Sequence, residues 1–188
     1  WANGEGDAPV EAADVSLPVK SIGHSTTTIV DVCDLDTAKQ VVWFLSDMIG
    51  VRLRQQGLLA HGISVCIRYN TLNSLSKQTQ MSFYTFDGGQ IADSAFLLLK
   101  TMWQGQSDVP LRLIGVSVFD LNTVAQDTQE SLFDSNREKK EQLNFTLDKI
   151  RKKYGYQSLQ KGIMMNNSVM TDKSPIEDTE FLPFKKLN

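Results

Sequence analysis

Three aspartates, Asp31, Asp34 and Asp36, stand close together and are the first residues to consider as metal ligands or acid–base groups. They fall where a β-branched run gives way to a helical apolar pattern, and aspartate is preferred at such a junction as a helix cap. His61 and Cys66 could in principle pair as a base and a nucleophile. Cys66, however, belongs to an alternating strand pattern, where a small packed thiol is far commoner. The sequence therefore predicts no catalytic residue and no metal site.

A second chemical feature is the apolar pair Leu132-Phe133, which interrupts a polar run over residues 126–138. The neighbouring residues offer no apolar periodicity that the pair could extend, so this segment cannot bury much surface by itself. Two interpretations stay open. The pair either packs locally on the preceding domain or is a binding segment for a partner.

Composition limits the class of protein. The chain has 188 residues, of which 41% are hydrophobic and 22% charged, typical of one soluble domain with appendages. No stretch approaches the roughly 20 apolar residues of a membrane span. The net charge of −3 arises from an acidic segment at residues 1–19, whereas residues 20–121 are balanced. A DNA-binding face would therefore be a local arrangement. Two cysteines and no recognisable signal segment favour a reduced, cytoplasmic setting.

The elements that must position these residues follow from periodicity. Strands are predicted over residues 19–32, 63–69, 79–86 and 111–119, with residues 70–78 as a turn. One helix follows a cap at Asp34 or Asp36 and stops at Gly57, and a second occupies residues 91–102. The order β-α-β-β-α-β predicts an α+β fold: a four-stranded sheet with both helices on one face. The opposite face is left free for a polar partner.

The two ends of the chain have a different character. Residues 1–19 contain glycine and proline and are interpreted as a linker. In residues 122–188, Ser135 to Glu138 form a capping box for a C-terminal helix. Its apolar stripe is Leu143, Leu147, Ile150 and Tyr154, and Gly155 ends it. Residues 164–188 are expected to be a loosely ordered tail.

Several short strings in this order resemble the C-terminal half of a Y-family (translesion) DNA polymerase. They are Lys20-Ser21-Ile22-Gly23, Thr26-Thr27, RLRQQGL at 52–58, LRLIGV at 111–116 and DKIRKKYG at 148–155. The last string is similar to the tail of the UmuC/DinB-like bacterial branch. The resemblance implies that residues 1–19 are the end of a thumb domain with its linker, and that residues 20–121 are a little-finger domain. The catalytic palm and its Mg²⁺ ions would belong to an upstream part of the parent polymerase.

The resemblance also implies which residues contact primer–template DNA. The first strand would run along the template backbone, where glycine allows close approach and hydroxyls bind phosphate oxygens. His24, Gln78 and Thr79 stand where relatives often have arginine, so we expect weak, sequence-independent binding. Arg52 and Arg54 are expected on the helix face away from DNA. The predicted DNA-binding residues are Lys20, Ser21, Gly23, His24, Ser25, Thr26, Arg68, Ser76, Lys77, Gln78, Thr79 and Arg112.

The polar run around Leu132-Phe133 can now be interpreted further. Gln129, Ser131, Leu132 and Phe133 resemble the pentapeptide that binds the bacterial sliding clamp, with glutamine in a polar notch and the apolar pair in a pocket. The resemblance implies a clamp-tethered polymerase in DNA damage tolerance, repair and the SOS response. The rival interpretations are a non-catalytic clamp-binding adaptor and a generic ferredoxin-like RNA- or protein-binding module.

Overall fold

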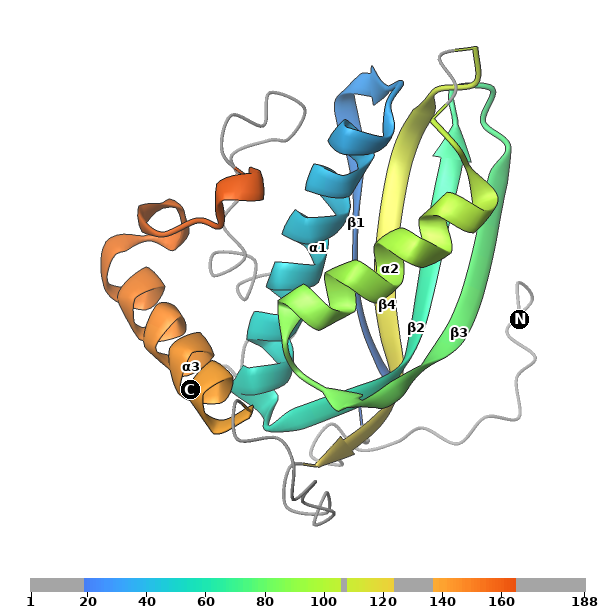
Figure 1. The fold of residues 1–188 in the computed structure, drawn as a ribbon. Helices are drawn as coiled ribbons and strands as arrows, with labels where there is room; N and C mark the ends of the chain where they lie inside the picture. Colours follow the sequence, from blue (N-terminus) through green and yellow to red (C-terminus); the bar gives the residue numbers. More distant parts are fainter. Residues whose placement is uncertain (1–18, 106–107, 124–136, 165–188) are drawn as a thin grey trace, which may run out of the picture.

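The computed structural model describes residues 19–105, 108–123 and 137–164, and the order of its elements confirms the predicted fold. All strand pairs are antiparallel, and the sheet order is β1-β4-β2-β3. Helices α1 and α2 lie side by side on one face of this sheet, and α3 lies along the outer side of α1 (Figure 1). The elements are β1 Ser21–Val32, α1 Leu35–Gln56, β2 Leu58–Tyr69, β3 Ser74–Thr85, α2 Gly88–Met102, β4 Leu111–Thr123 and α3 Arg137–Tyr154, followed by the 3₁₀ turns η2 Tyr156–Ser158 and η3 Gly162–Met164.

The core lies between the sheet and the two helices. Alternate residues of the central strands point into it, and the apolar stripes of α1 and α2 close it from the other side. Burying each large aliphatic side chain contributes about 1.5–3 kcal/mol, so this one-sided layer supplies most of the stability. Its fully buried members include Leu45, Ile49, Ile63, Val65, Ile67, Ile91, Leu99, Ile114 and Val118.

The ends of α1 show the role of Asp34. Asp34 is the N-cap: one carboxylate oxygen accepts the Thr37 backbone N–H at 2.7 Å and the other accepts the Thr37 hydroxyl at 2.8 Å. The bond from the Thr37 backbone N–H holds the pKa of Asp34 below its ordinary value. Gly57 ends the helix in the left-handed conformation at φ 63°. Both predicted boundaries are therefore confirmed, with Asp34 rather than Asp36 as the cap.

The predicted turn at residues 70–78 is wrong in its second half, because β3 begins at Ser74. The connection between β2 and β3 is confined to residues 70–73. It is closed by a hydrogen bond that the Tyr69 N–H donates to the Asn73 carbonyl oxygen. Leu72 provides the sharp bend at φ 70°. The side chains of residues 74–80 are exposed on both faces of the strand. Their sequence therefore lacks the alternation of apolar and polar residues that would indicate a strand. The ladder to β2 keeps them extended.

The end of the chain also differs from expectation. The predicted apolar stripe of α3 is only partly buried: Leu147 and Ile150 are half-buried, whereas Leu143 is 59% exposed and Tyr154 is 64% exposed. Charged residues, described below, also join α3 to α1. Met164 is buried against α1, so ordered structure continues to the first residue of the expected tail. The linker at 1–18, the capping-box residues Ser135 and Asn136 and the tail at 165–188 lie outside the described residues.

Helices α1 and α2 approach closely at Gly50 and Gly88. A Cβ atom on Gly88 would lie 2.8 Å from the Cα atom of Asp47 and 3.0 Å from the Ser46 carbonyl oxygen. We expect Gly88→Ala to lower the free energy of unfolding by about 1–3 kcal/mol, because backbone rather than a mobile side chain must move. Urea denaturation measures this change. Gly162→Ala is the control, since a Cβ there meets nothing within 4 Å. Equal stability of the two variants would contradict the close packing.

Candidate nucleic-acid interface

The sheet face opposite α1 and α2, which we call the open face, is defined by strand register. Ile63, Val65 and Ile67 point toward the helices, so the residues between them point the other way. Three rows cross all four strands on this side: Gly23, Ser117, Ser64 and Gln78; Ser25, Gly115, Cys66 and Ser76; Thr27, Leu113, Arg68 and Ser74. None of the described helices covers these rows.

The side chains of the open face are small and mostly polar. A Cβ atom on Gly23 would lie 2.8 Å from the Cβ of Ser117, and one on Gly115 would lie 3.0 Å from the Cβ of Ser25. The serines of the neighbouring strands therefore leave no room for a side chain at Gly23 or Gly115, and the small residues keep this surface flat. A flat surface with hydroxyl groups can approach a phosphate backbone closely and bind its oxygens. Charge is sparse: Arg68 is the cation of the three rows, and its Nε donates to the Ser74 hydroxyl at 3.1 Å.

The alternation divides the predicted DNA-binding residues into two groups. Ser21, Gly23, Ser25, Arg68, Ser76 and Gln78 belong to the open face. His24, Thr26, Lys77 and Thr79 occupy the intervening positions on the two edge strands and face the helix side. Lys77 confirms this direction, because its ammonium donates to the Thr101 hydroxyl of α2 at 3.1 Å. The expected turn at 76–79 would have let all four side chains point together, whereas a strand separates them. Their DNA contacts stay a prediction.

Two other predicted cations lie at the margins of the open face. Lys20 is exposed immediately before β1. Arg112 is exposed and lies at a β-bulge. Leu111 and Leu113 of β4 each pair with residues of β1 and β2, whereas Arg112 between them has no paired residue in either strand.

Arg52 reaches the same region, although we expected it to face away. Its Nη1 atom donates to the Gly23 carbonyl oxygen at 3.5 Å, which places the guanidinium at the free edge of β1. No sequence pattern reveals a contact between residues 29 positions apart. Arg54, by contrast, is buried in the contact with α3.

His61 and Cys66 lie in different surroundings. The His61 ring stacks on Tyr84 with centroids 4.9 Å apart, and its Nδ1 atom lies 3.1 Å from an Asp120 carboxylate oxygen. Cys66 belongs to the second row of the open face. Within the described ranges, no three His, Cys, Asp or Glu side chains are grouped so as to hold a metal ion. None of the described helices combines the length and apolarity needed to cross a membrane.

A second polar cluster joins α1 to α3, and we call it the α1–α3 lock. Asp47 accepts hydrogen bonds from Arg151 Nη1 at 2.7 Å and from the Tyr156 hydroxyl at 2.5 Å. Burial and the nearby Asp47 carboxylate raise the pKa of Tyr156, so its hydroxyl remains a donor. Arg54 pairs with Asp148 through two bonds of 2.6 and 2.8 Å, a bidentate arrangement.

Sequence reasoning missed the lock, although a signal was present. Asp47 and Arg54 are seven residues apart in α1, and Asp148 and Arg151 are three apart in α3. Each spacing places two opposite charges on one helix face, and the order of the charges is complementary. Only the packing of the helices reveals that these faces meet.

The sequence of this chain is similar to those of known proteins. A family model described as the impB/mucB/samB family C-terminal domain matches residues 19–132. The DNA polymerase IV of Acetivibrio thermocellus is 32% identical over 169 residues, covering 89% of this chain and 42% of that protein. That of Clostridium kluyveri is 28% identical over 176 residues, covering 89% and 43%. The chain therefore spans about two fifths of the length of these curated relatives.

One solved structure, a complex of the beta-clamp processivity factor and the little finger domain of PolIV, is similar with a TM-score of 0.45 and 16% identity. The similarity covers 60% of this chain and 98% of that chain. The family match, in contrast, extends over more than half of the chain. The chain therefore belongs to the impB/mucB/samB family and carries its C-terminal domain.

Proposed function

We propose that this chain is the DNA-binding and clamp-tethering C-terminal region of a translesion DNA polymerase acting in DNA damage tolerance and repair. The observation that carries the proposal is the open face, a flat surface of glycine and serine in a chain whose curated relatives are DNA polymerases IV. Nucleotide transfer and its Mg²⁺ ions would belong to a palm domain upstream. A coding sequence without palm carboxylates upstream would favour the clamp-binding adaptor instead.

On this proposal the open face lies along the DNA backbone. Hydroxyls of Ser25, Ser64 and Ser76 donate to phosphate oxygens, while Gly23 and Gly115 let the strands approach. Lys20, Arg52, Arg68 and Arg112 supply positive charge in and around the face. Phosphate contacts position the protein without specifying sequence, which suits a domain that must follow damaged templates. Few cations imply modest affinity with a shallow salt dependence.

The proposal predicts which lysines and arginines matter. We expect Lys20→Ala/Arg68→Ala/Arg112→Ala to weaken binding to junctions between duplex and single-stranded DNA by roughly tenfold or more, because each loses a phosphate contact. The slope of log affinity against log salt should fall by up to about 3 units. Fluorescence anisotropy at several salt concentrations measures both quantities.

The matched control removes the same number of charges from the helix side. Lys39→Ala/Lys100→Ala/Lys161→Ala leaves the open face intact, since Lys39 and Lys100 lie beside Phe96 and Lys161 lies over the Trp43 ring of α1. This variant should bind DNA nearly as well as the unmodified protein. If it weakened binding as much as the first variant, the open face would not be the DNA-binding surface.

The sliding-clamp segment at 129–133 lies outside the described residues, but its position in the chain supports tethering. It falls between the end of β4 at Thr123 and the start of α3 at Arg137. The lock fastens α3 to α1, so both ends of the intervening segment are attached to the domain. Clamp binding through this segment would raise the local concentration of a weak DNA-binding domain near the primer end.

A further inference from the structure

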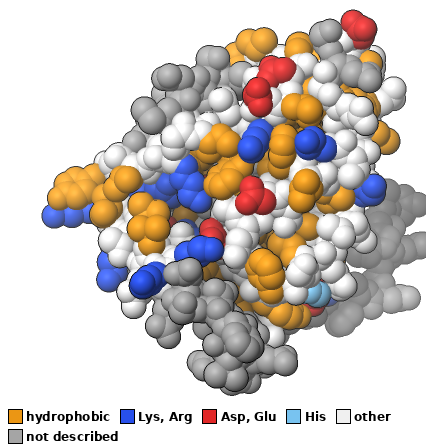
Figure 2. Space-filling model, in the orientation of Figure 1, with side chains coloured by type: hydrophobic (Ala, Val, Ile, Leu, Met, Phe, Trp, Pro, Cys, Tyr) orange, Lys and Arg blue, Asp and Glu red, His pale blue; other side chains and the backbone are white. Residues whose placement is uncertain are grey.

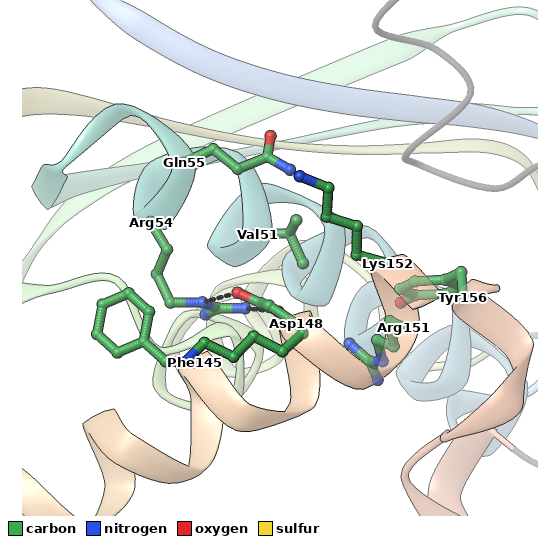
Figure 3. Close-up of a pocket in the computed structure, with 9 residues that line it drawn as sticks. Val51, Arg54, Gln55, Phe145, Asp148, Arg151, Lys152 and Tyr156 are labelled. Carbon is green, nitrogen blue, oxygen red and sulfur yellow. Dashed lines mark hydrogen bonds and ion pairs between the residues drawn. The ribbon is translucent and has the colours of Figure 1, made fainter. Parts of the chain in front are cut away.

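A cleft of about 520 Å³ lies between α1 and α3 (Figure 3). Val51, Phe145 and Tyr156 give it an apolar lining, and Lys149 and Lys152 line it with cations. Phe145 packs against Phe86 in a tilted arrangement with ring centroids 5.9 Å apart, yet 46% of it remains exposed. The cleft therefore presents an aromatic surface that the described residues leave uncovered.

The charges of the cleft do not cancel. Arg54 and Arg151 are each balanced by an aspartate of the lock. Lys149 and Lys152 have no ion-pair partner among the described residues, so the cleft carries two excess positive charges. Figure 2 shows lysine and arginine side chains gathered over α3 on this face. An apolar floor with a cationic rim fits a peptide that combines carboxylates with aromatic side chains.

The chain contains such a peptide beyond η3. Residues 176–184 read Ile-Glu-Asp-Thr-Glu-Phe-Leu-Pro-Phe, with three carboxylates followed by three large apolar side chains. The described chain ends at Met164 on the surface of α1, and 11 residues separate it from Ile176. An extended connection of that length spans up to about 40 Å, more than the distance across a helix pair.

We propose that residues 176–184 bind in the α1–α3 cleft of the same molecule. Glu177, Asp178 and Glu180 lie against Lys149 and Lys152, and Phe181 and Phe184 cover Phe145 and Val51. Because the connection is intramolecular, even weak contacts suffice to keep the peptide bound. The bound peptide excludes water from the lock, and it thereby reinforces the docking of α3 on α1.

Zero-length carbodiimide cross-linking of the full chain at low-micromolar concentration, followed by peptide mass spectrometry, tests this directly. We expect Lys149 and Lys152 to cross-link to Glu177, Asp178 or Glu180 several-fold more often than Lys139 and Lys140 do. Those two lysines are also exposed, lie at the start of the same helix and measure non-specific encounter. Equal yields, cross-links to Asp127 or Glu130 instead, or yields that rise with protein concentration would overturn the proposal.

A charge exchange provides the second measurement. Lys149→Glu/Lys152→Glu should speed amide hydrogen exchange in residues 141–156 several-fold, and adding Glu177→Lys/Asp178→Lys should restore protection. Lys139→Glu/Lys140→Glu combined with the same tail change is the control and should not restore it. Without restoration by the complementary pair, the lysines do not hold the tail, and the proposal fails. The proposed DNA-binding function is unaffected by either outcome, because the open face lies on the other side of the sheet.

Discussion

Asp47→Ala is expected to weaken the docking of α3 on α1 by about 3–5 kcal/mol. The substitution leaves the Arg151 guanidinium, whose side chain is 3% exposed, without its counter-ion, and leaves the Tyr156 hydroxyl without its acceptor. Breaking one member of a buried ion pair is costly because the remaining charge stays desolvated. The helix can escape this cost by undocking, which returns Arg151 to water. The loss of global stability is therefore limited to the free energy of docking.

Hydrogen exchange measured by mass spectrometry distinguishes undocking from unfolding. In Asp47→Ala, amides of residues 137–164 should exchange far faster, while those of β2 and β4 keep their protection, because the core does not include α3. Asp93→Ala, which removes an exposed carboxylate of α2, is the control and should change neither region. Adding Arg151→Met and Tyr156→Phe to Asp47→Ala should recover much of the docking, since the buried polar groups are then removed together. Unchanged exchange in Asp47→Ala would show that the lock does not hold α3.

The sheet and its two covering helices could be predicted because each element shows its own period. The alternation in β2 gives that strand one apolar face, and the helical spacing in α1 gives that helix one apolar face. Few arrangements of such elements bury every apolar face at once. Asp34 and Gly57 marked the ends of α1 because capping chemistry is local. Residues 74–78 could not be recognised as strand, since an edge strand exposed on both faces needs no alternation.

The candidate DNA-binding surface was only partly predictable, for a related reason. The family resemblance predicted Ser25, Arg68 and Lys77 together as DNA-binding residues. Whether two residues share a face depends on register, however, and register depends on pairing between strands. Arg52 and the α1–α3 lock depend on packing between elements far apart in the chain. Their residue types were visible in the sequence, whereas their partners were not.

The second large effect concerns the segment at residues 129–133. Leu132→Ala/Phe133→Ala, introduced into the parent polymerase, is expected to abolish binding to the bacterial sliding clamp. Buried anchors of a short peptide commonly carry about 2 kcal/mol or more each. Losing both would weaken binding by roughly a thousandfold. Surface plasmon resonance on immobilised clamp measures the change. DNA binding by the open face should persist, so primer extension should lose its stimulation by the clamp while activity without clamp is retained.

The matched control removes a leucine and a phenylalanine that are exposed on the domain itself. Leu97 and Phe83 are 66% and 51% exposed, so Leu97→Ala/Phe83→Ala deletes a similar apolar area without touching the segment. Clamp binding should survive in this variant. Normal clamp binding by Leu132→Ala/Phe133→Ala would show that the resemblance to the clamp-binding pentapeptide is accidental. A cooperative loss of the folded domain in that variant would instead identify Leu132 and Phe133 as a local plug of the core, since an exposed binding segment contributes nothing to the free energy of unfolding.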